Sequence, residues 1–151
     1  MRRFLSVCAA AVLSVAVFSG VAEAKKKSGG SPAAVRVWID VSSQTMSVNV
    51  NGWHYATWRV STARGGYYTP RGSYSAKRLA RMHYSRKYDN SPMPHSVFFH
   101  GGYAIHGTNY VKNLGRPASH GCVRLAPGAA AQLFKLVRQH GLGRTRITIT
   151  N

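Results

Sequence analysis

The stretch VRVWIDVSSQTMSVNVNGWHYATWRV, residues 35–60, decides the fold class. Apolar and polar residues alternate over residues 35–39 and again over residues 46–50, which is the pattern of half-buried β-strands. Asn51 and Gly52 follow the second run and lead into a further extended stretch. Asn-Gly between two such runs predicts a two-residue hairpin turn, because both turn positions need a positive φ. The domain is therefore expected to begin with a meander of strands.

The middle of the chain is less regular. The sequence TPRG at residues 69–72 predicts a turn. Residues 75–95 are mostly polar, basic and aromatic and contain two prolines, so we expect a long loop or lid there. Apolar residues at 97–99 and 103–105 flank a Gly-Gly pair and predict a second hairpin.

The C-terminal part predicts one helix and one strand. Residues 127–139 carry an apolar stripe at helical spacing, with Pro127 suited to the first turn and Gly141 to the end. Residues 144–150 alternate again, as a strand does. The whole pattern indicates a mainly β protein, a small β-sandwich or barrel with one C-terminal helix.

The N-terminal residues indicate export. Two arginines after Met1 precede an apolar run over residues 4–18, and an Ala-x-Ala cleavage signal follows. The run is too short to span a bilayer comfortably, so we expect residues 1–24 to be a signal peptide removed on secretion across the inner membrane. Residues 25–33 begin KKKSGGS and are expected to be a flexible basic linker. Residues 34–151 then form one domain in the periplasm or cell wall.

The charge balance narrows the choice of partners. The 151 residues contain 21 Lys and Arg and 3 Asp and Glu, for a formal net charge of +18. Such a charge attracts polyanions and anionic surfaces. Because an exported protein does not meet nucleic acid, the candidate partners are cell-envelope polymers, lipid phosphates and carboxylate-rich substrates. A charge that serves only solubility is the alternative, and we expect a monomer.

One segment, IHGTNYVKNLGRPASHGCVRL at residues 105–125, concentrates the reactive residue types. Of the two cysteines in the chain, Cys8 lies in the expected signal peptide, so the secreted domain has only Cys122 and forms no internal disulfide. A single thiol in an oxidising compartment is either buried and inert or kept because it reacts. A reactive thiol needs a nearby base or positive charge to form the thiolate.

The residues around Cys122 fit a catalytic site. His106 and His120 are both candidate bases, the first from an adjacent strand and the second from two residues before the thiol. Gly121 has no side chain, so a substrate carbonyl could approach the backbone N–H groups that would form an oxyanion hole. Arg124 adds positive potential and suits a substrate carboxylate, or is a solvated surface arginine.

Simpler interpretations apply to the other histidines and to the tryptophans. A zinc site made of His100, His106, His120 and Cys122 has no matching ligand spacing and few carboxylates to support it, so we expect no metal and no other cofactor. Four histidines are expected to be surface or core residues: His54, His83, His95 and His140. The three tryptophans are expected in the core or on the sheet surface, with sugar stacking as the alternative.

These motifs resemble a known family. The sequence SHGCVRL at residues 119–125, preceded by IHG at residues 105–107, is similar to the catalytic signature of the L,D-transpeptidases, the YkuD domain. The similarity also covers the TPRG turn and the HGGYAIHG stretch. It implies a β-sandwich-like fold with a Cys–His–backbone-carbonyl triad made of Cys122, His106 and Gly107.

The same resemblance implies roles for further residues. His120 and Gly121 would line the oxyanion side, while Ser119 and Arg124 would support the loop and the substrate. A loop tyrosine often lies near the site in relatives, and the sequence offers three without choosing between them: Tyr84, Tyr88 and Tyr103.

The implied reaction is acyl transfer on peptidoglycan stem peptides of the meso-diaminopimelate type. Cys122 would attack the carbonyl before the terminal D-alanine, release that residue and form a thioester, as it would also do with carbapenems. An amine of a second stem would give a 3-3 crosslink, water would give an L,D-carboxypeptidase reaction, and an envelope-protein amine would tether that protein to the wall. A catalytically inactive, cationic envelope-binding protein is the alternative from another class.

Overall fold

The structure, a computed structural model, describes residues 32–151. The expected signal peptide and nearly all of the expected linker lie outside the described residues. None of the helices in the described part of the chain is long and apolar enough to cross a membrane.

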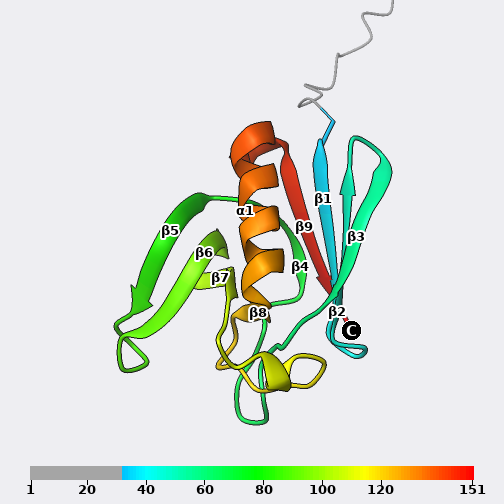
Figure 1. Cartoon of the computed structure of the whole chain (residues 1–151). Coiled ribbons are helices and arrows are strands. Elements are labelled where there is room, and N and C mark those ends of the chain that lie inside the picture. Colours follow the sequence, from blue (N-terminus) through cyan, green and yellow to red (C-terminus); the bar gives the residue numbers. More distant parts are fainter. Residues whose placement is uncertain (1–31) are drawn as a thin grey trace, which may run out of the picture.

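Two β-sheets and one α-helix make up the domain (Figure 1). The first sheet has the order β3-β2-β1-β9-β4 and the second has the order β5-β6-β7-β8. The strands of the first sheet are β1 (Val35–Asp40), β2 (Thr45–Val50), β3 (Trp53–Arg59), β4 (Gly72–Ser75) and β9 (Thr145–Thr150). Those of the second are β5 (Arg78–Ser85), β6 (Ser91–His100), β7 (Tyr103–Gly107) and β8 (Val123–Leu125). This architecture confirms the mainly β, two-sheet fold with one helix.

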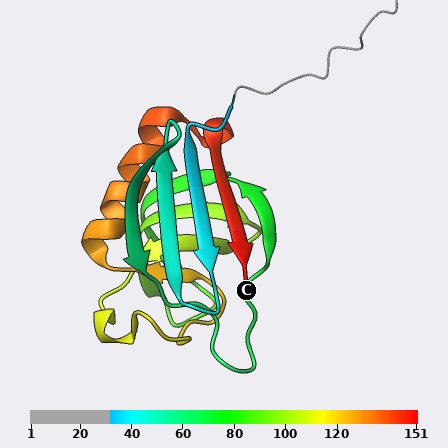
Figure 2. The ribbon, with the colours of Figure 1, turned by 90° about the vertical axis from the view of Figure 1, so that its right-hand side faces the viewer.

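The first sheet follows the alternation of the sequence. Asn51 and Gly52 have φ values of 51° and 91° and join β2 to β3, which confirms the predicted hairpin turn. β1 pairs with β2 in antiparallel and with β9 in parallel, so the first and last strands of the domain lie side by side (Figure 2). The residues of these strands that face inward are fully buried: Val35, Val37, Ile39, Met46, Val48, Ile147 and Ile149.

Helix α1 (Pro127–His140) completes the core. It packs along one side of the two sheets, against β6 and β7 (Figure 1). Its buried residues share one core with Phe99, Ile105, Val123 and both sheets, and include Ala130, Leu133 and Val137. Pro127 stands in the first turn and Gly141 ends the helix with a φ of 93°, both as predicted. Two short 3-10 helices, η1 (Val111–Asn113) and η2 (Leu142–Arg144), lie in connecting segments.

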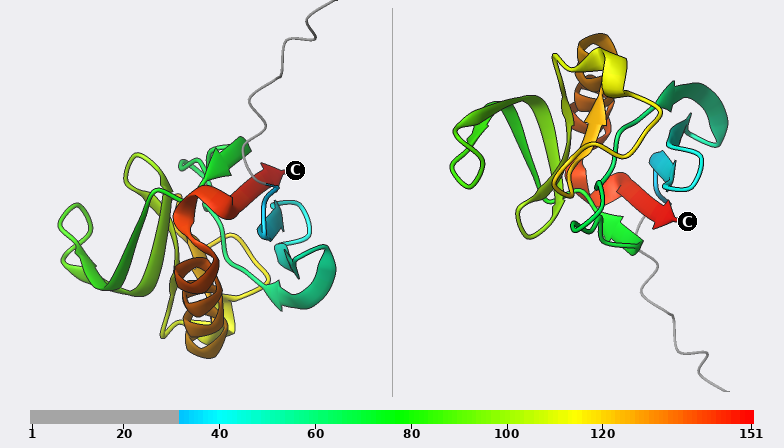
Figure 3. Two further views of the ribbon diagram at one scale, coloured as in Figure 1. Left: turned by 90° about the horizontal axis from the view of Figure 1, so that it is seen from above. Right: turned by 90° about the horizontal axis from the view of Figure 1, so that it is seen from below.

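The prediction of a long loop or lid over residues 75–95 is wrong. Most of this segment forms the β5–β6 hairpin, which projects from the body of the domain (Figure 3). Pro92 and Pro94 lie within β6, opposite Tyr84 and Met82. β7 pairs with β6 only from Val97 onward. The proline-containing half of β6 is therefore an edge, where a missing N–H breaks no ladder hydrogen bond.

A single residue reverses the alternation of β6. His95 has a φ of 53°, in the left-handed region that non-glycine residues rarely adopt. Before this residue Met93 faces a small cluster with Phe98 and Ala104, while after it Val97 and Phe99 face the main core. Met93 and Phe98 consequently lie on the same side of the second sheet, although their separation in the sequence predicts opposite sides.

Core packing of α1 gives the first prediction. Leu133 is 1% exposed, so Leu133→Ala is expected to lower the free energy of unfolding by about 2–5 kcal/mol through lost burial and a cavity. Lys135→Ala on the exposed face of the same helix is the matched control and should change it by less than about 0.5 kcal/mol. Urea denaturation measures both, and equal effects of the two substitutions would contradict the assigned packing.

Candidate active site

The parallel pairing of β7 with β8 brings the two halves of the signature segment together. Its register sets Ile105 opposite Val123 and His106 opposite Arg124. Ile105 and Val123 point into the main core, so the neighbouring residues point to the other face of the sheet. Cys122, directly before β8, joins the small cluster on that face with Ala104 and Phe98.

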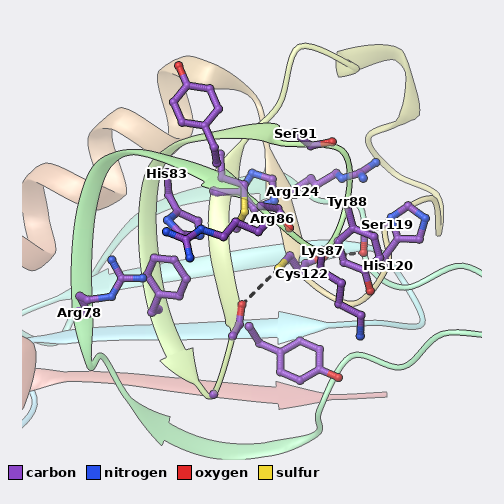
Figure 4. Close-up of a pocket in the computed structure, with 18 residues that line it drawn as sticks. Arg78, His83, Arg86, Lys87, Tyr88, Ser91, Ser119, His120, Cys122 and Arg124 are labelled. Carbon is purple, nitrogen blue, oxygen red and sulfur yellow. Dashed lines mark hydrogen bonds between the residues drawn. The ribbon is translucent and has the colours of Figure 1, made fainter.

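A cavity of about 660 Å³ lies on this face, beneath the β5–β6 hairpin (Figure 4). Five of the predicted site residues line it: His106, Ser119, His120, Cys122 and Arg124. The hairpin supplies the opposite wall, including Tyr84, Arg86 and Tyr88. The structure thus brings the thiol and both candidate bases to one cavity.

The imidazole of His106 is held in one tautomer. His106 is 6% exposed, and its Nδ1 lies 2.8 Å from the Gly107 carbonyl oxygen. Because a carbonyl only accepts, Nδ1 carries the proton and Nε2 keeps a free lone pair. Burial lowers the pKa of His106 from 6.5 to about 4, with the Gly107 hydrogen bond opposing this and the charges of Arg124 and His83 adding to it. The imidazole is therefore neutral at pH 7.

The thiol of Cys122 is also neutral in this state. Burial raises the pKa of Cys122, while the Ala104 backbone and the charge of Arg124 lower it. The S–H group points toward the Gly102 carbonyl oxygen at 4.0 Å (Figure 4). The site thus contains a protonated thiol and an unprotonated imidazole rather than a preformed ion pair.

The imidazole of His120 contacts three neighbouring side chains. Arg64 donates from Nη2 to His120 Nε2 at 2.8 Å, so this nitrogen has no free lone pair. The Tyr88 ring stacks on the imidazole at 4.4 Å between centroids and the Tyr67 ring meets it edge-on at 4.6 Å. Partial burial and the charges of Arg64 and Arg124 lower the pKa of His120. Of the two candidate bases, His106 is the one whose Nε2 is free.

Ser119 and Gly121 shape the loop before Cys122. The hydroxyl of Ser119 donates to the Cys122 carbonyl oxygen at 2.6 Å and accepts from the Gly121 N–H at 3.0 Å. The Gly121 N–H is therefore occupied and not free to bind an oxyanion in this conformation. Gly121 has a φ of 128°, and a Cβ there would lie 2.6 Å from Tyr103 Cε1 and 2.8 Å from the Tyr68 carbonyl oxygen. Backbone conformation and close packing are thus why the position is glycine.

The segment after β3 anchors the same loop. Ser61 and Arg124 exchange two backbone hydrogen bonds, at 3.0 and 2.9 Å. The Thr62 carbonyl accepts from the Ser119 N–H at 2.9 Å, and Arg64 N–H donates to the Ser119 carbonyl at 3.0 Å. Residues 61–64 thereby act as a short extra strand beside β8, which fixes the backbone on both sides of Cys122.

Several residues at the cavity were not identified from the sequence. His83 was expected to be a surface or core residue, but it lines the cavity with Arg78, Arg86 and Lys87. All three candidate tyrosines also line it, and Tyr88 is the one in contact with His120. Histidine, arginine and tyrosine are residue types that often bind substrates, so their chemistry pointed to a site. Their place near Cys122 could not be predicted, because the β5–β6 hairpin that carries most of them was not predicted.

His100, another candidate zinc ligand, lies outside the cavity lining. It packs against Tyr74, with ring centroids 5.2 Å apart. Within residues 32–151, no three His, Cys, Asp or Glu side chains converge in an arrangement suited to a metal ion. Trp38 is 41% exposed on the first sheet, whereas Trp58 packs against the core.

Comparison with known proteins identifies the family. Residues 34–149 match the YkuD family, described as the L,D-transpeptidase catalytic domain, and the chain belongs to this family. No curated protein sequence matches the chain.

Solved structures share the fold. An L,D-transpeptidase from Mycobacterium smegmatis is 24% identical, with a TM-score of 0.70 over 79% of this chain and 59% of that one. An L,D-transpeptidase from Xylanimonas cellulosilytica is 27% identical, with a TM-score of 0.67 over 80% and 62% of the two chains. The LD transpeptidase LdtMt1 in complex with imipenem is 24% identical, with a TM-score of 0.69 over 78% and 59%. The chain therefore spans less than two thirds of the length of these relatives.

The packing at Gly121 gives the second prediction. Gly121→Ala forces a side chain into a left-handed φ and against the Tyr103 ring and Tyr68 backbone, so it should lower the free energy of unfolding by about 1–3 kcal/mol. Gly128→Ala is the control, because a Cβ there meets nothing within 4 Å, and its effect should be about 1 kcal/mol or less. An unchanged melting curve for Gly121→Ala would show that the loop geometry is wrong.

Proposed function

We propose that this protein is a peptidoglycan L,D-transpeptidase that works through a thioester on Cys122. The observation that supports it is the pairing of a family match over residues 34–149 with a cavity that contains both Cys122 and a neutral His106. In this proposal the triad is Cys122, His106 and the Gly107 carbonyl, with Gly107 acting only to orient the imidazole. Residues 1–24 direct export, and residues 34–151 act on the wall in the periplasm.

The acylation step follows from the protonation states. As Cys122 Sγ attacks the carbonyl between meso-diaminopimelate and the terminal D-alanine, His106 Nε2 accepts the thiol proton. The proton then passes to the nitrogen of D-alanine as the C–N bond breaks. D-alanine leaves, and the third residue of the stem remains on the sulfur as a thioester. A neutral imidazole is required at the start, which the lowered pKa of His106 provides.

The deacylation step reverses these proton transfers. An amine of a second stem peptide attacks the thioester, loses a proton to His106 and forms the 3-3 crosslink. The C–S bond breaks and the proton returns to Cys122. Arg124, half-buried beside the thiol, adds positive potential that favours the anionic sulfur and the oxyanion in both steps.

Replacement of the nucleophile gives the third prediction. Wild-type protein incubated with muropeptides that carry tetrapeptide stems should form 3-3 crosslinked dimers, whereas Cys122→Ala should form none and keep its fold. Imipenem should add one adduct mass to the wild type and none to the variant, since an LD transpeptidase of similar fold is known in complex with it. Mass spectrometry measures both reactions.

The products also identify the acceptor. If the stems are shortened to tripeptides and no dimers form, the protein is a carboxypeptidase. If a muropeptide becomes attached to an envelope protein included in the reaction, the protein is a tethering enzyme. An unmodified Cys122 after exposure to both imipenem and muropeptides would contradict acyl transfer and favour a binding protein.

The state of His106 gives the fourth prediction. Activity needs the unprotonated imidazole, so kcat/KM should be retained as the pH falls below 6.5 and should be lost only as it passes through about 4. Initial rates of imipenem acylation across the acid range measure this profile, with circular dichroism to verify that the protein stays folded. An acid limb near the ordinary histidine value of 6.5 would show that His106 is not a buried neutral base.

A further inference from the structure

Arg78 is a basic residue of the cavity outside the proposed triad. It is the first residue of β5 and lines the cavity together with Phe98 and His83. Its guanidinium carbon lies 3.7 Å from the centroid of the Phe98 ring, and the His83 imidazole meets the same ring edge-on at 5.1 Å. Stacking on an aromatic face restricts the guanidinium while leaving its N–H edge free to bind a planar anion.

The strand register connects Arg78 to the thiol. Arg78 pairs with Phe98, and Phe98 pairs with Ala104. Because Ile105 pairs with Val123, Ala104 is level with Cys122 in the next strand. Adjacent strands are about 4.8 Å apart, so a guanidinium over Phe98 lies on the order of 10 Å from Cys122 across the sheet. Figure 4 shows Arg78 and His120 on opposite sides of Cys122.

The cavity contains no partner for this charge. Its lining includes Arg78, Arg86, Lys87 and Arg124, and none of the lining residues is Asp or Glu. Asp40, one of two acidic residues in the described part of the chain, lies in the first sheet and accepts hydrogen bonds from Ser42 and Ser43. The other, Asp89, is exposed in the turn of the β5–β6 hairpin. Arg78 is exposed and has no acidic side chain beside it in this cavity, so its guanidinium is available to an anionic group of a ligand.

We propose that Arg78 determines specificity for the donor residue, the one that is acylated onto Cys122. Arg78 binds a free carboxylate at the end of that residue's side chain. This inference rests on the proposed function. The acyl carbon is bound at sulfur, so a group that reaches Arg78 must extend across the cavity on a long side chain. The distal carboxylate of meso-diaminopimelate is such a group, and it fits the guanidinium as a two-point acceptor. Its carboxamide form has no charge and loses this pairing.

A matched pair of donors tests the proposal. Tetrapeptide stems that differ only in a carboxylate or a carboxamide at the end of the diaminopimelate side chain are compared in kcat/KM. Wild type should prefer the carboxylate about 10- to 100-fold, the range expected for charge-assisted hydrogen bonds. Arg78→Gln should bring the two donors near equality by slowing only the carboxylate form.

The control variant removes the same charge from the same strand. Arg81 is exposed on β5 and does not line this cavity, so Arg81→Gln should keep the wild-type preference. Loss of preference in both variants would assign the effect to the overall field of the protein and overturn the proposal. A preference that persists in Arg78→Gln, or that is absent in wild type, would overturn it as well.

Binding measurements separate this inference from the proposed reaction. In the Cys122→Ala background, calorimetry should show the same 10- to 100-fold preference in Kd, lost on adding Arg78→Gln. A preference in binding without any acylation of the wild type would contradict the proposed function and leave the Arg78 site supported. Acylation of the wild type with equal binding of both donors would do the opposite.

Discussion

The parallel pairing of β7 with β8 is the constraint on which the site depends. It sets two segments distant in sequence side by side, so that His106 and Cys122 reach one face while Ile105 and Val123 fill the core. A register shift of one residue in β8 would turn Cys122 toward the core while His106 stayed on the other face. The core on the other side of the sheet therefore holds the site in place, and α1 together with residues 61–64 secures it.

Burial has two effects on the chemistry. It keeps the His106 imidazole and the Cys122 thiol neutral, which disfavours a resting ion pair. It also weakens solvent screening around half-buried Arg124, so this charge acts more strongly on any charge that forms at the thiol. In the proposed reaction a thiolate or oxyanion is therefore favoured only when it is generated, close to Arg124, and the Cys122 thiol stays protonated until then.

The sequence was informative where structure is local. Asn51-Gly52, the α1 stripe and the alternating strands follow from periodicity and turn chemistry, and the signature segment located Cys122 and His106. The β5–β6 hairpin was missed because Pro92 and Pro94 argue against a strand unless it is known to lie at an edge. Arg78 and His83 were missed with it, since only strand register shows that they face the thiol. Gly121 was expected to admit a substrate carbonyl, whereas its positive φ and the close approach of Tyr103 give a packing reason for glycine at this position.

In the proposed reaction His106 is a neutral base whose tautomer is set by the Gly107 carbonyl. Nitrogen-15 NMR of the imidazole, recorded as a function of pH, measures tautomer and protonation directly. We expect the Nδ1–H form at neutral pH, with protonation of Nε2 only as the pH approaches about 4. An Nε2–H tautomer, or an imidazolium already present at neutral pH, would contradict the assignment.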